Sequence, residues 1–137
     1  MMETVPATLN DAIAAQPLWL QGWVMVMVVV HALALVFIVH RTPAGWRVRP
    51  EPIAILVAFV AAGALMTWLF GQVGYVRLLG LAHLVFWGPV YVWILRRRRQ
   101  IGAGSLFGKY VLLYLVIAGL SLVVDTLDVV RYVIGDG

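Results

Sequence analysis

Apolar residues fill four long segments of this chain, and short polar or basic stretches separate them. The segments cover residues 18–40, 52–70, 74–95 and 106–134. A helix needs about 20 residues to cross the hydrocarbon core of a bilayer, and each segment is near or above that length. The pattern predicts an all-α integral membrane protein, a bundle of four transmembrane helices in which sequential helices are antiparallel neighbours.

The last segment carries a polar stripe on a helix otherwise rich in Leu, Val and Ile. Successive members of the stripe are three or four residues apart, which places them on one face of an α-helix. They are Tyr110, Tyr114, Ala118, Ser121, Asp125, Asp128 and Tyr132. Lipid cannot satisfy such a face, so we expect another helix, a partner chain or water to cover it.

The composition indicates one membrane domain over residues 1–137. The chain is 64% hydrophobic and 12% charged, with a mean hydropathy of +0.98, which is more apolar surface than a soluble domain of this length can bury. It contains no cysteine, which excludes disulfides, thiolate nucleophiles and Cys-ligated metal sites. Although the formal net charge is +4, the basic residues flank apolar segments, so we expect no nucleic-acid partner.

Charged residues indicate how the chain is oriented in the membrane. Eight of the ten basic residues lie in or beside the connecting segments 41–51 and 96–105, and five of the six acidic residues lie toward the opposite side, Glu51 being the exception. The positive-inside rule then places both basic loops in the cytoplasm and both termini outside it. We expect a multi-pass cell-membrane protein, in bacteria of the inner membrane, with the lipid bilayer as its partner.

The connecting segments carry further signals. Residues 71–74 are expected to form the outer turn, Ser105 to cap the last helix, and His40 to be solvated at the cytoplasmic interface. The arginine run is a stop-transfer and orientation signal that also binds anionic lipid headgroups on the cytoplasmic face. Its members are Arg96, Arg97, Arg98 and Arg99.

The N-terminal segment, residues 1–17, is expected to lie outside the cytoplasm. Residues 6–15 are predicted to form a short helix on the membrane surface. Three apolar residues at four-residue spacing share one face there: Val5, Leu9 and Ile13. Because the segment has no basic n-region, we expect no cleaved signal peptide.

The third segment, residues 74–95, also has a polar side. Five residues fall within one arc of the predicted helix: Arg77, Gly80, His83, Trp87 and Tyr91. Counting about 1.5 Å per residue places His83 about 13 Å below the outer end of its helix, and Asp125 lies equally deep in the last helix. We therefore expect His83 to pair with Asp125, and Arg77 with Asp128.

Two interpretations of the acidic cluster remain open. Residues 106–124 alone are long enough to span the membrane, so Asp125, Asp128 and Arg131 fit an ordinary interfacial charge cluster. The apolar residues that continue the segment favour burial instead. A buried cluster fits either a structural Arg–Asp clamp or an ion site, because a buried charge needs a partner in both.

The sequence favours a non-enzymatic membrane protein with a polar intramembrane site or path for protons or small ions. Such a protein would be channel- or transporter-like. The residues expected in the site are His83, Asp125, Asp128, Arg77, Arg131, Ser121 and Tyr114. The principal alternative is a structural or accessory subunit of a membrane complex. An enzyme is less favoured because hydrolase, phosphate-loop and dinucleotide motifs are missing, and no catalytic residue or metal site is predicted.

Haem b binding is the further alternative. His31 and His83 lie in different apolar segments, and two intramembrane histidines on facing helices can ligate a haem. Their depths match only loosely, and the sequence has no second pair of histidines for a transmembrane electron chain. We therefore predict no cofactor, with His83 hydrogen-bonded to the last helix or to water.

Self-association is expected from helix packing. Ala54, Ala58 and Ala62 form a ladder of small residues with Gly63 beside it, and such ladders let membrane helices approach closely. A unit this small has few ways to bury both the ladder and the polar stripe within one chain. We therefore predict a homo-oligomer or a subunit of a larger membrane complex.

The predicted orientation can be checked with a reporter that is active only in the cytoplasm. Fused to the C-terminus, the reporter is expected to give no signal, because the positive-inside rule places that end outside. The same reporter inserted in the connecting segment 96–105 is expected to be active. A bright signal from the C-terminal fusion contradicts the topology.

Overall fold

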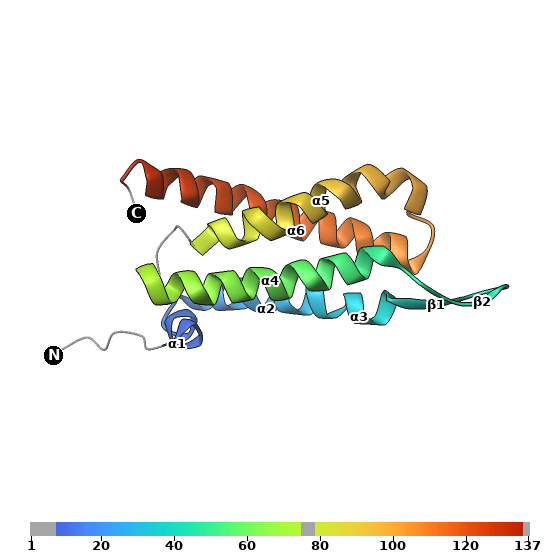
Figure 1. Cartoon of the computed structure of the whole chain (residues 1–137), viewed down its shortest axis with the longest axis horizontal. Helices are drawn as coiled ribbons and strands as arrows, with labels where there is room; N and C mark the ends of the chain where they lie inside the picture. The colour runs from blue at the N-terminus through green and yellow to red at the C-terminus, as the bar shows by residue number, and fades with distance from the viewer. Residues whose placement is uncertain (1–7, 75–78, 136–137) are drawn as a thin grey trace.

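The computed structural model describes residues 8–74 and 79–135, and 81% of the structure is helical. Long helices lie side by side along the molecule, and a two-stranded hairpin projects from one end (Figure 1). In chain order the elements are α1 (Leu9–Ala14), α2 (Leu18–Ala32), α3 (Ala34–Phe37), β1 (Val39–Thr42), β2 (Gly45–Val48), α4 (Pro50–Val73), α5 (Gly80–Ile101) and α6 (Leu106–Val133). We call the end that carries β1, β2 and the α5–α6 connection the basic end.

Within the described residues, three helical stretches are long and apolar enough to cross a membrane, namely Leu18–Phe37, Pro50–Val73 and Leu106–Val133. They make the chain a plausible multi-pass membrane protein. The apolar part of α5 is shorter, because only residues 80–95 precede the arginine run. Those residues span about 24 Å, against about 30 Å for the hydrocarbon core. Of the four predicted spans, three meet the criterion of length and hydropathy.

The all-α prediction is wrong for residues 39–48, which form an antiparallel hairpin. The sequence predicted a helix to residue 40 and then a basic loop, but α3, which continues α2, ends at Phe37. Val39 pairs with Val48, and the Thr42 hydroxyl donates to the Gly45 carbonyl at 2.8 Å across the turn. The signal that was missed is a run of β-branched and aromatic residues around a Pro–Ala–Gly turn.

Helix α4 is longer than the predicted segment 52–70. Proline lacks a backbone N–H, which the first turn of a helix does not need, so the helix begins at Pro50. It ends at Val73, before Gly74, whose φ of +76° lies in the left-handed region that favours glycine. Most of the predicted outer turn at residues 71–74 is therefore helical.

Helix α5 is displaced toward the C-terminus relative to the predicted segment 74–95. It begins at Gly80, and residues 75–78 lie outside the described part of the chain. The arginine run, predicted to be a loop, belongs to the helix because arginine is a good helix former. The helix ends before Gly102, whose φ is +72°.

Two helix N-termini are capped by hydroxyl groups. The Ser105 cap is confirmed, since the Gly108 amide donates to its Oγ at 3.0 Å. Thr8 caps α1 in the same way through the Asp11 amide, so the surface helix is shorter than predicted. Val5 and Pro6 lie outside the described residues.

The polar stripe of α6 faces the other helices of the chain, which is one of the three coverings that the sequence left open. Tyr110, Tyr114, Ala118, Ser121 and Asp125 are buried, whereas Asp128 and Tyr132 are half-buried. The Tyr110 hydroxyl donates to the Val30 carbonyl of α2 at 2.7 Å. In the main core, this face packs with residues of α3, α4 and α5, including Ala34, Ile55 and Ile94.

The small-residue ladder packs within the chain, which removes the reason given for self-association. Ala58 and Ala62 of the small-residue ladder are buried inside the bundle, where Met27 and Trp87 pack with them. One chain therefore buries both the ladder and most of the polar stripe. Oligomerisation remains a prediction without this premise.

A partly buried ion pair joins α4 to α5 near the basic end. Glu51 is 4% exposed, and its Oε1 accepts from Arg97 Nε at 2.8 Å. Nearby, Arg49 donates to the Phe37 carbonyl at 3.0 Å and lies over the Phe107 ring at 4.4 Å. These two arginines tie the rods together rather than serving only as orientation signals.

Substitution in the arginine run is expected to separate the structural arginine from an exposed one. Arg97→Gln leaves the buried Glu51 without its ion-pair partner and is expected to cost about 1–3 kcal/mol of stability. Arg96→Gln removes the same charge from an exposed position and is expected to change stability by less than about 0.5 kcal/mol. Thermal unfolding in detergent measures both, and equal losses contradict the assignment.

Candidate functional site

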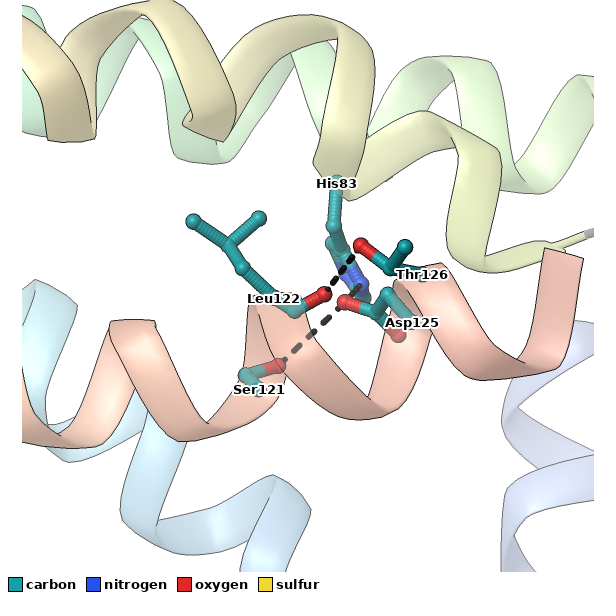
Figure 2. A network of polar contacts seen from close by, with 5 residues as sticks. All are labelled: His83, Ser121, Leu122, Asp125 and Thr126. Carbon is teal, nitrogen blue, oxygen red and sulfur yellow. Dashed lines mark hydrogen bonds and ion pairs between the residues drawn. The ribbon is translucent and has the colours of Figure 1, made fainter. Parts of the chain in front are cut away.

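The predicted contact between His83 of α5 and Asp125 of α6 is present. His83 Nδ1 lies 2.9 Å from Asp125 Oδ2, and the Ser121 hydroxyl, one turn earlier on α6, donates to the same oxygen at 3.4 Å (Figure 2). The side chains of His83 and Asp125 are 21% and 13% exposed. The three residues form a partly buried polar site that only the pairing of two helices assembles.

Gly80 allows α5 to approach α6 closely at this site. A methyl group added at Gly80 would lie 3.1 Å from Asp125 Cβ and 3.2 Å from its Cα. The neighbouring backbone leaves almost no room for a side chain, so the two helices approach closely next to the carboxylate. Glycine at this position lets the imidazole of His83, one turn along α5, reach Asp125.

The site lies in the half of the bundle away from the basic end. Asp125 is eight residues before the end of α6 at Val133, or about 12 Å. His83 is only three residues after the start of α5 at Gly80, or about 4.5 Å. The sequence estimate of 13 Å for His83 assumed a helix from residue 74, so α5 places this histidine nearer to its own helix end.

Aromatic rings continue from His83 into the bundle. The Trp87 ring lies 4.2 Å from the His83 ring and 4.4 Å from the His31 ring, measured between centroids. His31 in turn stacks on Phe59 at 4.7 Å and meets Tyr114 edge-on at 5.9 Å. His31 is 1% exposed, and its Nδ1 lies 2.7 Å from the Met27 carbonyl oxygen.

Two buried nitrogens have no hydrogen-bond partner among the described residues. One is Trp87 Nε1, in the aromatic cluster beside both histidines. The other is His40 Nδ1 on β1, although the sequence predicted a solvated imidazole there. The sequence did not indicate the hairpin, in which His40 pairs with Arg47 of β2.

The remaining predicted site residues take different places. Arg77 lies outside the described residues, so its pairing with Asp128 stays a prediction. Asp128 is half-buried and Arg131 is exposed, and both make interactions within the chain. Tyr114 is fully buried but contacts His31 rather than the His83–Asp125 pair. Trp87 contacts both His83 and His31, although it was not among the predicted site residues.

The chemistry available at the site is that of two ionisable groups in direct contact. A neutral imidazole beside a carboxylate carries a net charge of −1, and uptake of one proton makes the pair neutral. Within the described residues, no group of three His, Asp or Glu side chains is placed to hold a metal ion.

Comparisons with protein families, with curated proteins and with solved structures find no match to this chain.

Substitution of Gly80 is expected to separate α5 from α6 at the site. Gly80→Ala places a methyl group against the Asp125 backbone and is expected to cost about 1–3 kcal/mol of stability, as overpacking does. Gly63→Ala is the matched control, since a methyl group there meets nothing within 4 Å and alanine favours the helix. Thermal unfolding in detergent compares them, and an equal response would show that the close approach is unimportant.

The haem alternative is tested by colour. Bis-histidine ligation needs the two coordinating nitrogens about 4 Å apart across one iron. Here both imidazoles pack on the Trp87 ring. We expect a colourless purified protein. A haem spectrum that His83→Ala abolishes would replace the function proposed below.

Proposed function

We propose that this chain is a small multi-pass membrane protein that binds and releases protons at the His83–Asp125 pair. The contact of 2.9 Å between the two side chains, on neighbouring helices, carries the proposal. Histidine is the side chain whose unperturbed titration falls nearest to neutral pH, and a carboxylate beside it can share its proton. Intramembrane pairs of this kind are characteristic of proton pathways.

The surroundings of the pair fix its geometry. The Ser121 hydroxyl donates to the same carboxylate that His83 contacts, so the carboxylate is held by groups on both α6 and α5. The His83 side chain is 21% exposed, so the imidazole is not sealed inside the bundle.

Onward transfer would run through the aromatic cluster to His31. The rings themselves do not carry protons, and the hydroxyls of Tyr91 and Tyr110 donate to backbone carbonyls. Trp87 Nε1, which lacks an acceptor among the described residues, can donate to a water, but an indole N–H only donates and relays no proton. The site is thus proposed as the outer entry of a path that requires ordered water.

The proposed topology has four spans with both termini outside the cytoplasm. Helix α5 is the short one, and the long stems of its arginines can extend past the hydrocarbon core to the headgroups. In a bacterium, this orientation places the His83–Asp125 pair toward the outer side of the inner membrane.

A structural or accessory subunit is the rival function. The pair also clamps α5 to α6, and Gly80 packs against Asp125, so the same contact serves stability without any transport. Under this alternative, neutralising Asp125 lowers stability and assembly but changes no flux. The two proposals therefore differ in a measurable quantity.

Proton flux in proteoliposomes tests the proposal. An imposed potential drives protons toward a pH-sensitive dye trapped inside, and Asp125→Asn is expected to reduce the protein-dependent rate at least about tenfold. The reason is that asparagine keeps the shape and hydrogen bonds of the residue but cannot bind a proton.

Thr126→Val is the matched control for this experiment. Thr126 follows Asp125 on α6, is exposed, and donates its hydroxyl to the Leu122 carbonyl at 2.8 Å rather than to the pair (Figure 2). This isosteric change is expected to leave the flux intact. If wild type and Asp125→Asn are equally silent while both are folded, transport at this site is refuted and the accessory role stands.

A further inference from the structure

The arginine run at the end of α5 is divided by the fold into different environments. Arg97 is engaged with Glu51, whereas Arg98 and Arg99 are exposed and, among the described residues, no acidic side chain pairs with either. These two line a hollow of about 280 Å³ at the α5–α6 connection, together with Gly102, Ala103, Gly108, Val111 and Leu112. The hollow thus has a cationic side and an apolar side.

A second hollow continues from the first along α5 and α6. It has a volume of about 460 Å³ and shares Arg98 and Leu112 with the first. The rest of its lining is apolar or aromatic: Tyr91, Leu95, Leu115, Val116, Gly119, Leu120 and Val123. A groove therefore leads from a pair of guanidinium groups into the space between two helices.

Glycines form the shape of both hollows. Gly108 lets the backbone of the connection lie directly against α6, because any side chain there would collide with Gly102 and Ala103. Gly119 lets Tyr91 lie across α6, and the Tyr91 hydroxyl is fixed by the Leu115 carbonyl at 3.0 Å. The floor of the groove is therefore held in place by hydrogen bonding and close packing.

We propose that this groove binds one anionic phospholipid, with its phosphate at Arg98 and Arg99 and an acyl chain along α6. Guanidinium groups bind phosphate oxygens in bidentate fashion, and anionic lipids concentrate at basic juxtamembrane residues. From Leu112 to Val123 the groove is about 16 Å long, close to the 15 Å or so of one leaflet's hydrocarbon. The inference rests on the bundle lying in a bilayer and not on the proton site.

The apolar lining selects a lipid over a free phosphate. Val116, Leu120 and Val123 are each more than half exposed, so an occupant with a long apolar part covers surface that a soluble anion leaves bare. The charge of the two arginines selects a lipid with net negative charge. Arg98, which lines both hollows, lies where the phosphate and the acyl chain of such a lipid join.

Native mass spectrometry of the full chain in mild detergent tests the proposal. The probes are phosphatidylglycerol, phosphatidylcholine with the same acyl chains, and glycerol phosphate. We expect one retained phosphatidylglycerol per chain, weaker retention of phosphatidylcholine, and no displacement by glycerol phosphate. Arg98→Gln with Arg99→Gln is expected to weaken retention about thirtyfold.

Two control pairs make this result specific. Arg96→Gln with Lys109→Gln removes two exposed charges near the same end but outside the hollows, and is expected to change retention little. Val116→Trp fills the groove and is expected to release the lipid, whereas Leu113→Trp adds the same side chain to α6 outside it. Replacing both hollow arginines by lysine keeps the charge and is expected to keep most of the binding, should the glutamine variant fold poorly.

Several outcomes overturn the proposal. If the two lipids are retained equally, or if the Arg98/Arg99 and Arg96/Lys109 double variants have equal effects, lipids coat the protein without a specific site. Displacement by glycerol phosphate, or no difference between the two tryptophan variants, means an anion site without an acyl chain. A lipid-free dimer that Val116→Trp dissociates means that a second copy of the chain occupies the groove.

Discussion

Asp125 must face the interior of the bundle, and much of the packing of α6 follows from this requirement. A carboxylate turned toward lipid would lose its hydration without any partner, at a cost of several kcal/mol. Residues at helical spacing from Asp125 share its face, so Ser121, Ala118 and Tyr114 are buried with it. Gly80 and His83 of α5 then complete the contact, one by being small and the other by reaching the carboxylate.

The basic end obeys a related constraint with different partners. Glu51 is a buried acid in the first turn of α4, and Arg97 neutralises it from α5. Because one arginine of the run points to Glu51, its neighbours Arg98 and Arg99 are carried by the helical twist to the α6 side. A run of four identical residues thereby acquires one member in an ion pair and others that are exposed.

Helix α5 carries both of the sites proposed here, at opposite ends. His83 lies one turn from its start, and Arg98 lies in its last turn. Between them, Trp87 and Tyr91 pack against α2 and α6 through the His31 ring, the Tyr114 ring and the Leu115 carbonyl.

The sequence by itself determined the membrane character, the helical rods, the polar face of α6 and the pairing of His83 with Asp125. These follow from hydropathy and from the 3.6-residue period, which act locally along the chain. The pairing was predictable because both residues stand out as polar on otherwise apolar helices. The four-span topology, the ion site and self-association remain predictions.

Only the tertiary structure decided the rest. The hairpin at residues 39–48, the extension of α5 through the arginines and the burial of Glu51 all depend on which segments meet. Hydrophobic periodicity cannot predict which segments meet, because the sequence does not show whether water or an opposite charge solvates a charged residue. The position of Trp87 beside two histidines from different helices is likewise a property of packing, since contacts between distant residues leave no local pattern.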